Sequence, residues 1–203
     1  MRLILASNSP RRAEILRTAG IPFEVRAANI DEAQYPGEAP GEYVRRLAEA
    51  KARAAAAKFG AEDPRAAAII IGADTTVEID GAILAKPQSD DDARQMLERL
   101  SGRAHEVYTG VALLPLPAGD VRVFEEITRV EFAPLSVAEI RDYVASGESS
   151  DKAGGYAIQG LAGKFVRRIE GCHFNVMGLP LARVYSELKL LGWSPAARDK
   201  EAV

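Results

Sequence analysis

The chain has 203 residues, of which 47% are hydrophobic and 27% are charged, which is typical of a globular protein of one domain or two small lobes. Its formal net charge of −3 argues against nucleic acid as a partner. One cysteine and two histidines exclude an intrachain disulfide framework and argue against a Cys/His zinc site or a Ser-His-Asp triad. No apolar run reaches the roughly 20 residues of a membrane span or forms a signal-peptide core, so we expect a cytoplasmic protein without a membrane partner.

The first third of the chain alternates strand-like and helix-like segments. The pattern predicts a strand over residues 2–6, a helix over 10–18 that stops at Gly20, a strand over 22–28 and a long helix over 40–58. Strands that alternate with helices in this way indicate an α/β fold.

The run Ser7-Asn8-Ser9-Pro10-Arg11-Arg12 joins the first predicted strand to the first helix. Ser9 suits the N-cap and Pro10 the first helical position, so Arg11 and Arg12 fall in the first turn, where free backbone N–H groups favour an anion. Basic side chains there oppose the helix dipole unless a negative group lies between them. We interpret the run as a phosphate-binding corner; the alternative is an ordinary capped helix with two solvated arginines.

An uninterrupted apolar run over residues 66–73 predicts a central strand that is covered on both faces. Asp74 follows directly, so we expect its carboxylate at the carboxyl end of that strand, where open α/β sheets bind ligands. The alternative is that Asp74 caps the following turn.

The pair Asp80-Gly81 is a strong signal for a two-residue hairpin turn over residues 75–86. In that register Thr75 pairs with Lys86, which brings the lysine close to Asp74. The alternative is a solvated lysine on an edge strand.

Two further charged residues join this predicted cluster. Lys51 falls on the apolar stripe of the helix over 40–58, so it either has a carboxylate or phosphate partner or extends to the rim of the buried face. Glu32, in the preceding loop, is either a second carboxylate beside Asp74 for Mg²⁺ or a solvated loop acid. Four cations from three elements are thus expected around the carboxylate of Asp74; they are Arg11, Arg12, Lys51 and Lys86. Such a cluster suits a polyphosphate with a divalent ion, and Asp74 is the candidate base.

Past the hairpin we predict a helix over 89–100 and then two long strands within 105–132, which form a second lobe. A second helix over 136–147, an ordered loop over 147–163 and a closing helix over 179–191 follow. Ser136 and Glu139 form a capping box at the start of the second helix. The Gly- and Ser-rich loop contains Lys152, Tyr156 and Gln159, which indicates a binding loop rather than a linker.

Short segments in chain order, from about residue 2 to 192, resemble the Maf family of nucleoside triphosphate pyrophosphatases. They are Ser7-Asn8-Ser9-Pro10-Arg11-Arg12, Glu49-Ala50-Lys51-Ala52, Gly72-Ala73-Asp74-Thr75, Lys86-Pro87, Ser101-Gly102, the run 151–160 and Asn175-Val176-Met177-Gly178-Leu179-Pro180. The resemblance implies hydrolysis of a nucleoside triphosphate between the α- and β-phosphates to a monophosphate and pyrophosphate, with Mg²⁺ or Mn²⁺. It also implies an elongated mixed α/β sheet flanked by helices, two lobes around a deep cleft, and a homodimer. The biological role stays open between cleansing of the nucleotide pool and control of cell division. We expect a single domain over 1–203 with a flexible tail from about 194.

The subgroup that acts on dTTP and UTP has Arg, Thr and Gln at positions that here are Arg11, Thr75 and Gln159. The resemblance implies that Asp74 is the proton acceptor. It also implies substrate or metal binding by Ser7, Arg12, Glu32, Lys51 and Lys86. A glutamine amide can donate to O4 and accept from N3–H of uracil or thymine, but guanine offers a similar pair, so Gln159 alone does not exclude a purine.

Two alternatives stay open beside a dTTP/UTP pyrophosphatase. One is a 7-methyl-GTP pyrophosphatase of the same family, and the other is a nucleotide-binding regulator of septum formation. A regulator needs no base, so an Asp74→Asn variant separates binding from turnover. RNA binding is disfavoured because a basic surface and an aromatic recognition signature are both missing.

Overall fold

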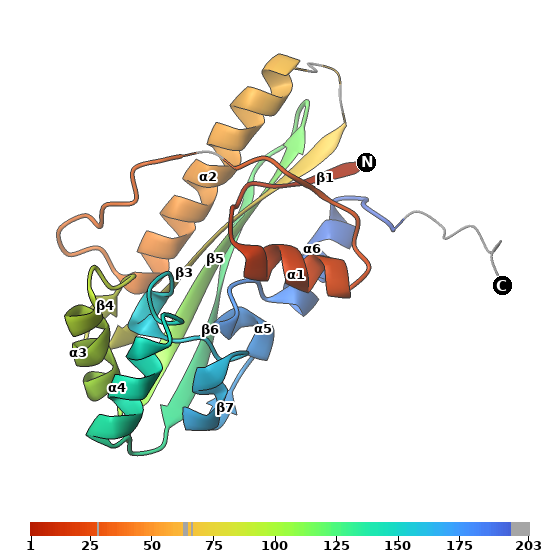
Figure 1. Cartoon of the computed structure of the whole chain (residues 1–203). Helices are drawn as coiled ribbons and strands as arrows, with labels where there is room; N and C mark the ends of the chain where they lie inside the picture. The colour runs from red at the N-terminus through yellow and green to blue at the C-terminus, as the bar shows by residue number, and fades with distance from the viewer. Residues whose placement is uncertain (28, 63–64, 66, 196–203) are drawn as a thin grey trace, which may run out of the picture.

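The computed structural model describes residues 1–27, 29–62, 65 and 67–195 and shows an elongated mixed sheet flanked by helices (Figure 1). The strands are β1 (Arg2–Leu5), β2 (Glu24–Val25), β3 (Ala68–Ile79), β4 (Ala82–Leu84), β5 (Ala104–Leu116), β6 (Arg122–Phe132) and β7 (Val166–Glu170). The helices are α1 (Pro10–Thr18), α2 (Pro40–Glu62), α3 (Asp90–Leu100), α4 (Val137–Ala145), α5 (His173–Val176) and α6 (Leu181–Leu190), with 3₁₀ turns η1 (Ala153–Gly155) and η2 (Leu161–Phe165). The predicted α/β class is confirmed. None of the helices in these ranges is both long and apolar enough to cross a bilayer.

One sheet runs through the molecule in the order β2-β1-β3-β5-β6-β7, with β4 paired to β3. β1 is parallel to β2 and β3, whereas the other pairs are antiparallel. The long strands β3, β5 and β6 extend through both halves of the molecule (Figure 1). The strands predicted over 105–132 therefore do not make up a lobe of their own, because they belong to the same sheet as β3.

Helices cover both faces of one half of the sheet, with α2 on one face and α1 and α6 on the other (Figure 1). In β3, Ile69 and Ile71 pack in a core cluster with residues of α1 and α6, while Ile70 packs in a cluster with residues of α2. All three side chains are fully buried. Successive side chains of a strand point to opposite faces, so the uninterrupted apolar run is explained by burial on both faces, as predicted.

Glycines allow α2 to lie directly on the sheet. A Cβ at Gly72 of β3 would overlap the main-chain oxygen of Ala48, and one at Gly110 of β5 would overlap that of Val44. The helix axis therefore approaches the strands more closely than a side chain would permit. This close approach brings Lys51, one turn along from Ala48, down to the sheet.

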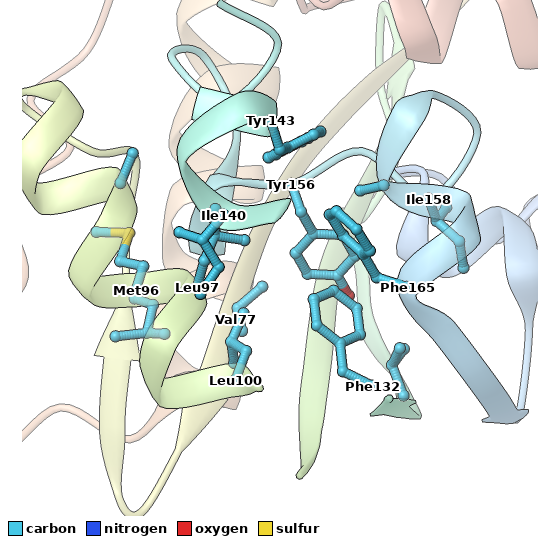
Figure 2. Close-up of a cluster of buried hydrophobic side chains, with 14 of the residues drawn as sticks. Val77, Met96, Leu97, Leu100, Phe132, Ile140, Tyr143, Tyr156, Ile158 and Phe165 are labelled. Atoms are coloured by element: carbon cyan, nitrogen blue, oxygen red, sulfur yellow. The ribbon is translucent and has the colours of Figure 1, made fainter. Parts of the chain in front are cut away.

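The other half of the sheet is covered by α3, α4 and the two 3₁₀ turns, around a buried cluster with several aromatic rings (Figure 2). The rings of Phe132 and Tyr156 lie edge to face with centroids 4.8 Å apart. The predicted capping box of Ser136 and Glu139 is present at the start of α4. The loop between α4 and β7 contains two 3₁₀ turns, in agreement with the prediction that it is ordered.

Local predictions differ from the structure at several points. The strand predicted over 22–28 is shorter in the structure, where β2 covers only Glu24–Val25. Residue 28, residue 66 at the start of the strand predicted over 66–73, and the tail from residue 196 lie outside the described residues. Ser9 is the N-cap residue of α1, but its side chain makes no capping hydrogen bond.

The position predicted for Asp74 at a strand end is also wrong. β3 continues through it to Ile79, because β5 pairs with β3 from Ala68 to Glu78. The hairpin turn is right, since Ile79 pairs with Ala82, but the ladder stops at Leu84. Lys86 is therefore not paired with Thr75.

Candidate active site

The site lies at an interruption in the pairing along one edge of β3. β1 pairs with β3 as far as Ile71, and β4 begins to pair with it at Val77. On this edge, no described strand pairs with the residues in between, while on the other edge Asp74 pairs with Gly110 of β5. The chain leaves β1 toward α1 at this point, so the first turn of α1 comes to the same gap.

A pocket occupies this gap, and seven of the nine predicted site residues line it: Arg11, Arg12, Lys51, Asp74, Thr75, Lys86 and Gln159. Ser7 and Glu32 do not line it. Ser7 is buried behind the pocket, where its hydroxyl accepts a hydrogen bond from Arg12. The topology brings the seven lining residues to one place, while the roles of all nine residues stay predictions.

Lys51 lies between two carboxylates at one side of this pocket. Its Nζ is 2.6 Å from Asp74 Oδ1 and 2.6 Å from Glu32 Oε1. The loop that contains Glu32 is held to α2 by Tyr43, whose hydroxyl donates to the main-chain oxygen of Glu32 at 3.0 Å. The charge on the apolar stripe of α2 therefore has carboxylate partners, which is the first of the two alternatives the sequence left open.

The two carboxylates have opposite pKa shifts. Asp74 is only 8% exposed, and its burial raises its pKa above the ordinary value, although the charges of Lys51 and Arg12 act in the other direction. Glu32 is less buried; desolvation also opposes its ionisation, but the hydrogen bond and charge of Lys51 outweigh it and lower the pKa of Glu32. Burial therefore makes Asp74 more basic than an ordinary aspartate, a change that favours a proton acceptor.

Arg12 is a buried cation whose polar atoms are held by the protein. Its Nε donates to the main-chain oxygen of Gly178 at 2.8 Å, and its two Nη atoms donate to Ser7 Oγ at 3.0 Å and Thr75 Oγ1 at 3.1 Å. Burial lowers the pKa of Arg12, partly offset by Asp74, but a guanidinium stays charged in proteins. Arg12 is therefore a fixed positive charge at the pocket wall.

Arg11 reaches across the pocket to the loop that follows α4. Its Nη1 is 3.1 Å from Asp151 Oδ2, and the ammonium of Lys152 contacts the other oxygen of the same carboxylate. Desolvation opposes ionisation of Asp151, but the bonds from Lys152 and Arg11 hold its pKa below the usual range. No role had been predicted for Asp151, although the Gly- and Ser-rich composition of its loop was the signal that marked this segment.

Tyr156 anchors this loop to the sheet. Tyr156 lines the pocket and belongs to the buried cluster of Figure 2. Its hydroxyl is 2.8 Å from Nε2 of His105 on β5. Burial lowers the pKa of His105 to about 4, so the imidazole is neutral at pH 7. Gln159, three residues beyond Tyr156, is exposed at the pocket, as is Lys86 in the segment that follows β4.

The donor set near Asp74 fits a hard divalent cation with limited protein ligation. The described residues contain no group of three or more His, Cys, Asp or Glu side chains that could hold a metal ion. Asp74 and Glu32 nevertheless converge on one small cation, the ammonium of Lys51. Mg²⁺ is commonly bound by one or two carboxylates together with waters and substrate phosphates, and this pair of oxygen ligands suits that arrangement.

The fold and the pocket together define an enzyme-type site for a polyanion, in which arginines and lysines from separate elements surround one buried carboxylate of raised pKa. Residues 2–191 match the family described as Maf-like protein. The chain belongs to the Maf family.

Relatives of similar length carry one name. A protein of Syntrophomonas wolfei is 47% identical over 93% of this chain and 96% of its own length. Proteins of Hahella chejuensis and Koribacter versatilis are each 48% identical over 95% of both chains. All three are named dTTP/UTP pyrophosphatase. A solved structure from Mycobacterium abscessus, named as a nucleoside-triphosphatase and dITP/XTP pyrophosphatase, covers 94% of each chain at 17% identity with a TM-score of 0.40.

Proposed function

We propose that this protein hydrolyses dTTP and UTP between the α- and β-phosphates and releases the nucleoside monophosphate and pyrophosphate. One observation carries the proposal: the buried carboxylate of Asp74 contacts Lys51 in a pocket that is also lined by the cations Arg11, Arg12, Lys86 and Lys152. The names of the relatives, at 47–48% identity over nearly the whole chain, support the pyrimidine substrates rather than 7-methyl-GTP.

The triphosphate would be held by charge. A nucleoside triphosphate carries close to four negative charges, and phosphoryl transfer depends on positioning and on neutralisation of charge. Arg12 is fixed at the pocket wall, whereas Lys86 is exposed and can extend to a ligand. Arg11 and Lys152 share Asp151 as a partner, and both can turn from it toward phosphate oxygens.

Asp74 would act as the general base. Its carboxylate accepts a proton from water as the water oxygen forms a bond to the α-phosphorus, and the bond between that phosphorus and the bridging oxygen to the β-phosphate breaks. The bond electrons leave with pyrophosphate. Asp74 and Glu32 would hold a divalent ion, which when bound supplies charge neutralisation on the phosphates.

The base would be selected by Gln159, Thr75 and Arg11. The amide of Gln159 can donate to O4 and accept from N3–H, a pattern shared by uracil and thymine and inverted in cytosine. Cytoplasmic location and a homodimer stay predictions from the sequence.

The test is pyrophosphate release by the wild type and by Asp74→Asn, with Mg²⁺, on dTTP, UTP, CTP, GTP, ATP and 7-methyl-GTP. Because a general base contributes about 10²–10⁴-fold, we expect at least about a 100-fold loss of kcat in Asp74→Asn, with binding of dTTP retained. Asp142→Asn is the matched control, since its carboxylate is 69% exposed on α4 and lies outside the pocket.

Wild-type preference for 7-methyl-GTP would move the protein to the sibling subgroup. Nucleotide binding without any turnover would replace the enzyme by a regulator. Full activity of Asp74→Asn would remove Asp74 from the role of base while leaving the substrate assignment intact.

A further inference from the structure

Thr109 of β5 is fully buried and does not line the pocket, yet it contacts a residue that does. It pairs with Thr75 across the sheet, and the two hydroxyl oxygens are 2.9 Å apart. Thr109 Oγ1 is also 2.9 Å from the main-chain oxygen of Asn175 in α5. The hydroxyl of Thr109 thus lies between the pocket wall and the Asn175 main chain.

The chemistry of these groups sets the direction of each hydrogen bond. The carbonyl oxygen of Asn175 can only accept, so the single hydroxyl hydrogen of Thr109 is directed to it. Thr109 Oγ1 must then accept from Thr75, whose hydrogen is used in that bond. Arg12 can only donate, so Thr75 Oγ1 accepts from its Nη2 at 3.1 Å.

The chain of bonds closes into a ring through Gly178. The N–H of Gly178 donates to the oxygen of Asn175 at 2.9 Å, and the oxygen of Gly178 accepts from Arg12 Nε at 2.8 Å. A Cβ at Gly178 would lie 3.3 Å from Thr75 Oγ1, and its φ of +110° disfavours other residues. The ring is therefore packed tightly and joins α1, β3, β5 and the segment after α5.

The ring leaves Thr75 with only one way to meet a ligand. Its hydrogen points to Thr109 and one lone pair accepts from Arg12, so one lone pair of Oγ1 remains. Thr75 lines the pocket, where this lone pair can accept a hydrogen bond but the hydroxyl cannot donate one. Uracil and thymine have one donor at N3, which the Gln159 amide oxygen and Thr75 Oγ1 can share as acceptors, whereas N3 of cytosine is itself an acceptor.

We propose that Thr109 is a positioning residue that makes Thr75 an acceptor toward the base and so disfavours cytosine. The inference rests on the proposed function, because it assumes that a pyrimidine base lies against Thr75. Without the Thr109 hydroxyl, Thr75 is free to turn its hydrogen into the pocket and donate to N3 of cytosine.

The test compares Thr109→Val with the wild type through the ratio of kcat/KM for UTP over CTP. One misdirected hydrogen bond corresponds to about tenfold in discrimination, so we expect the ratio to fall about tenfold in Thr109→Val. Thr109→Ser keeps the hydroxyl and should restore the wild-type ratio. In a Thr75→Val background, Thr109→Val should change the ratio no further, because it acts through the Thr75 hydroxyl.

Thr76→Val is the matched control. Thr76 adjoins Thr75 on β3 and is 1% exposed, and its Oγ1 has no hydrogen-bond partner among the described residues. The same change there should leave the ratio unaltered. If Thr109→Val does not fold, Thr109→Ala against Thr109→Ser isolates the hydroxyl in the same way.

A second readout separates this inference from the proposed function. Calorimetric binding of UTP and CTP with Mg²⁺, measured in an Asp74→Asn background, reports the base preference without turnover. A wild-type protein that hydrolyses no nucleotide would defeat the proposed function, but Thr109→Val would still be expected to lower the UTP:CTP ratio of affinities. An unchanged ratio in Thr109→Val, or an equal change in Thr76→Val, would overturn the positioning role.

Discussion

At the scale of single residues, Asp74 is governed by a competition between burial and charge. Burial raises its pKa, while Lys51 and Arg12 lower it, and burial has the larger effect. The direct contact between Lys51 Nζ and Asp74 Oδ1 favours the ionised carboxylate and so opposes the effect of burial. The proposed role of Asp74 as a general base depends on this balance, because a base must be ionised and must also bind a proton.

Lys51→Met should move the acid limb of the pH–rate profile of dTTP hydrolysis to higher pH. Asp74 must be deprotonated to act, so kcat/KM rises with pH through its pKa, and in the wild type this limb should lie above pH ~4, the ordinary value for an aspartate. Loss of the neighbouring cation raises that pKa further. Lys51→Arg keeps the charge and is the control; a limb that stays in place in Lys51→Met would contradict the assignment of Asp74.

At the scale of elements, the close packing of α2 on β3 creates the ion pair. Gly72 and Asp74 lie two residues apart on β3 and so face the same side of the sheet, where α2 lies. The absence of a side chain at Gly72 lets the helix approach until Lys51 reaches the carboxylate. A glycine inside a strand thus has a role in forming the site.

Gly72→Ala should therefore lower both stability and activity. The new Cβ would overlap the Ala48 oxygen and push α2 away from the sheet. Overpacking of this kind typically costs about 1–3 kcal/mol, so we expect the free energy of unfolding, measured in urea, to fall by that amount. Gly60→Ala is the control, because Gly60 lies in the same helix with nothing within 4 Å of its Cβ position. That change should be neutral or stabilise by up to about 1 kcal/mol. Wild-type stability in Gly72→Ala would show that the helix can shift without cost.

At the scale of the whole molecule, one sheet connects two differently covered halves (Figure 1). The pocket lies in the stretch of β3 between the end of its pairing with β1 and the start of its pairing with β4. The half covered by α3 and α4 has an aromatic core. There, His105 is hydrogen-bonded to Tyr156, which belongs to the loop between α4 and β7. Global stability and the position of the loop therefore depend on the same buried imidazole.

Stability should fall as the pH drops below about 6.5, in part because of His105. The unfolded imidazole gains a proton near pH 6.5, while the folded one stays neutral until about pH 4, so the unfolded state binds more protons in this window. Between pH 7 and 5 this linkage removes about 2 kcal/mol of unfolding free energy. His105→Gln should reduce the pH dependence by that amount in urea titrations. His173→Gln, at the exposed second histidine, should not; equal slopes for all three proteins would refute the prediction.

The class of fold and seven of the residues that line the pocket could be predicted from the sequence. Apolar periodicity, the capping signals at Ser89 and Ser136 and the turn at Asp80-Gly81 are local, since each depends on a few neighbouring residues. The charged side chains could also be selected, because Lys51 on an apolar stripe requires a partner wherever the helix packs. Recognition of the family then added Gln159 and Thr75.

How these residues meet depends on contacts between distant parts of the chain. The position of Asp74 within a continuous strand depends on pairing with β5, more than 30 residues away, which no local pattern encodes. The contact of Arg11 with Asp151 and the bond from Thr109 to Asn175 join segments far apart in the chain. Their geometry follows from how the helices and the sheet pack, and packing is set by the sum of long-range contacts rather than by any one segment.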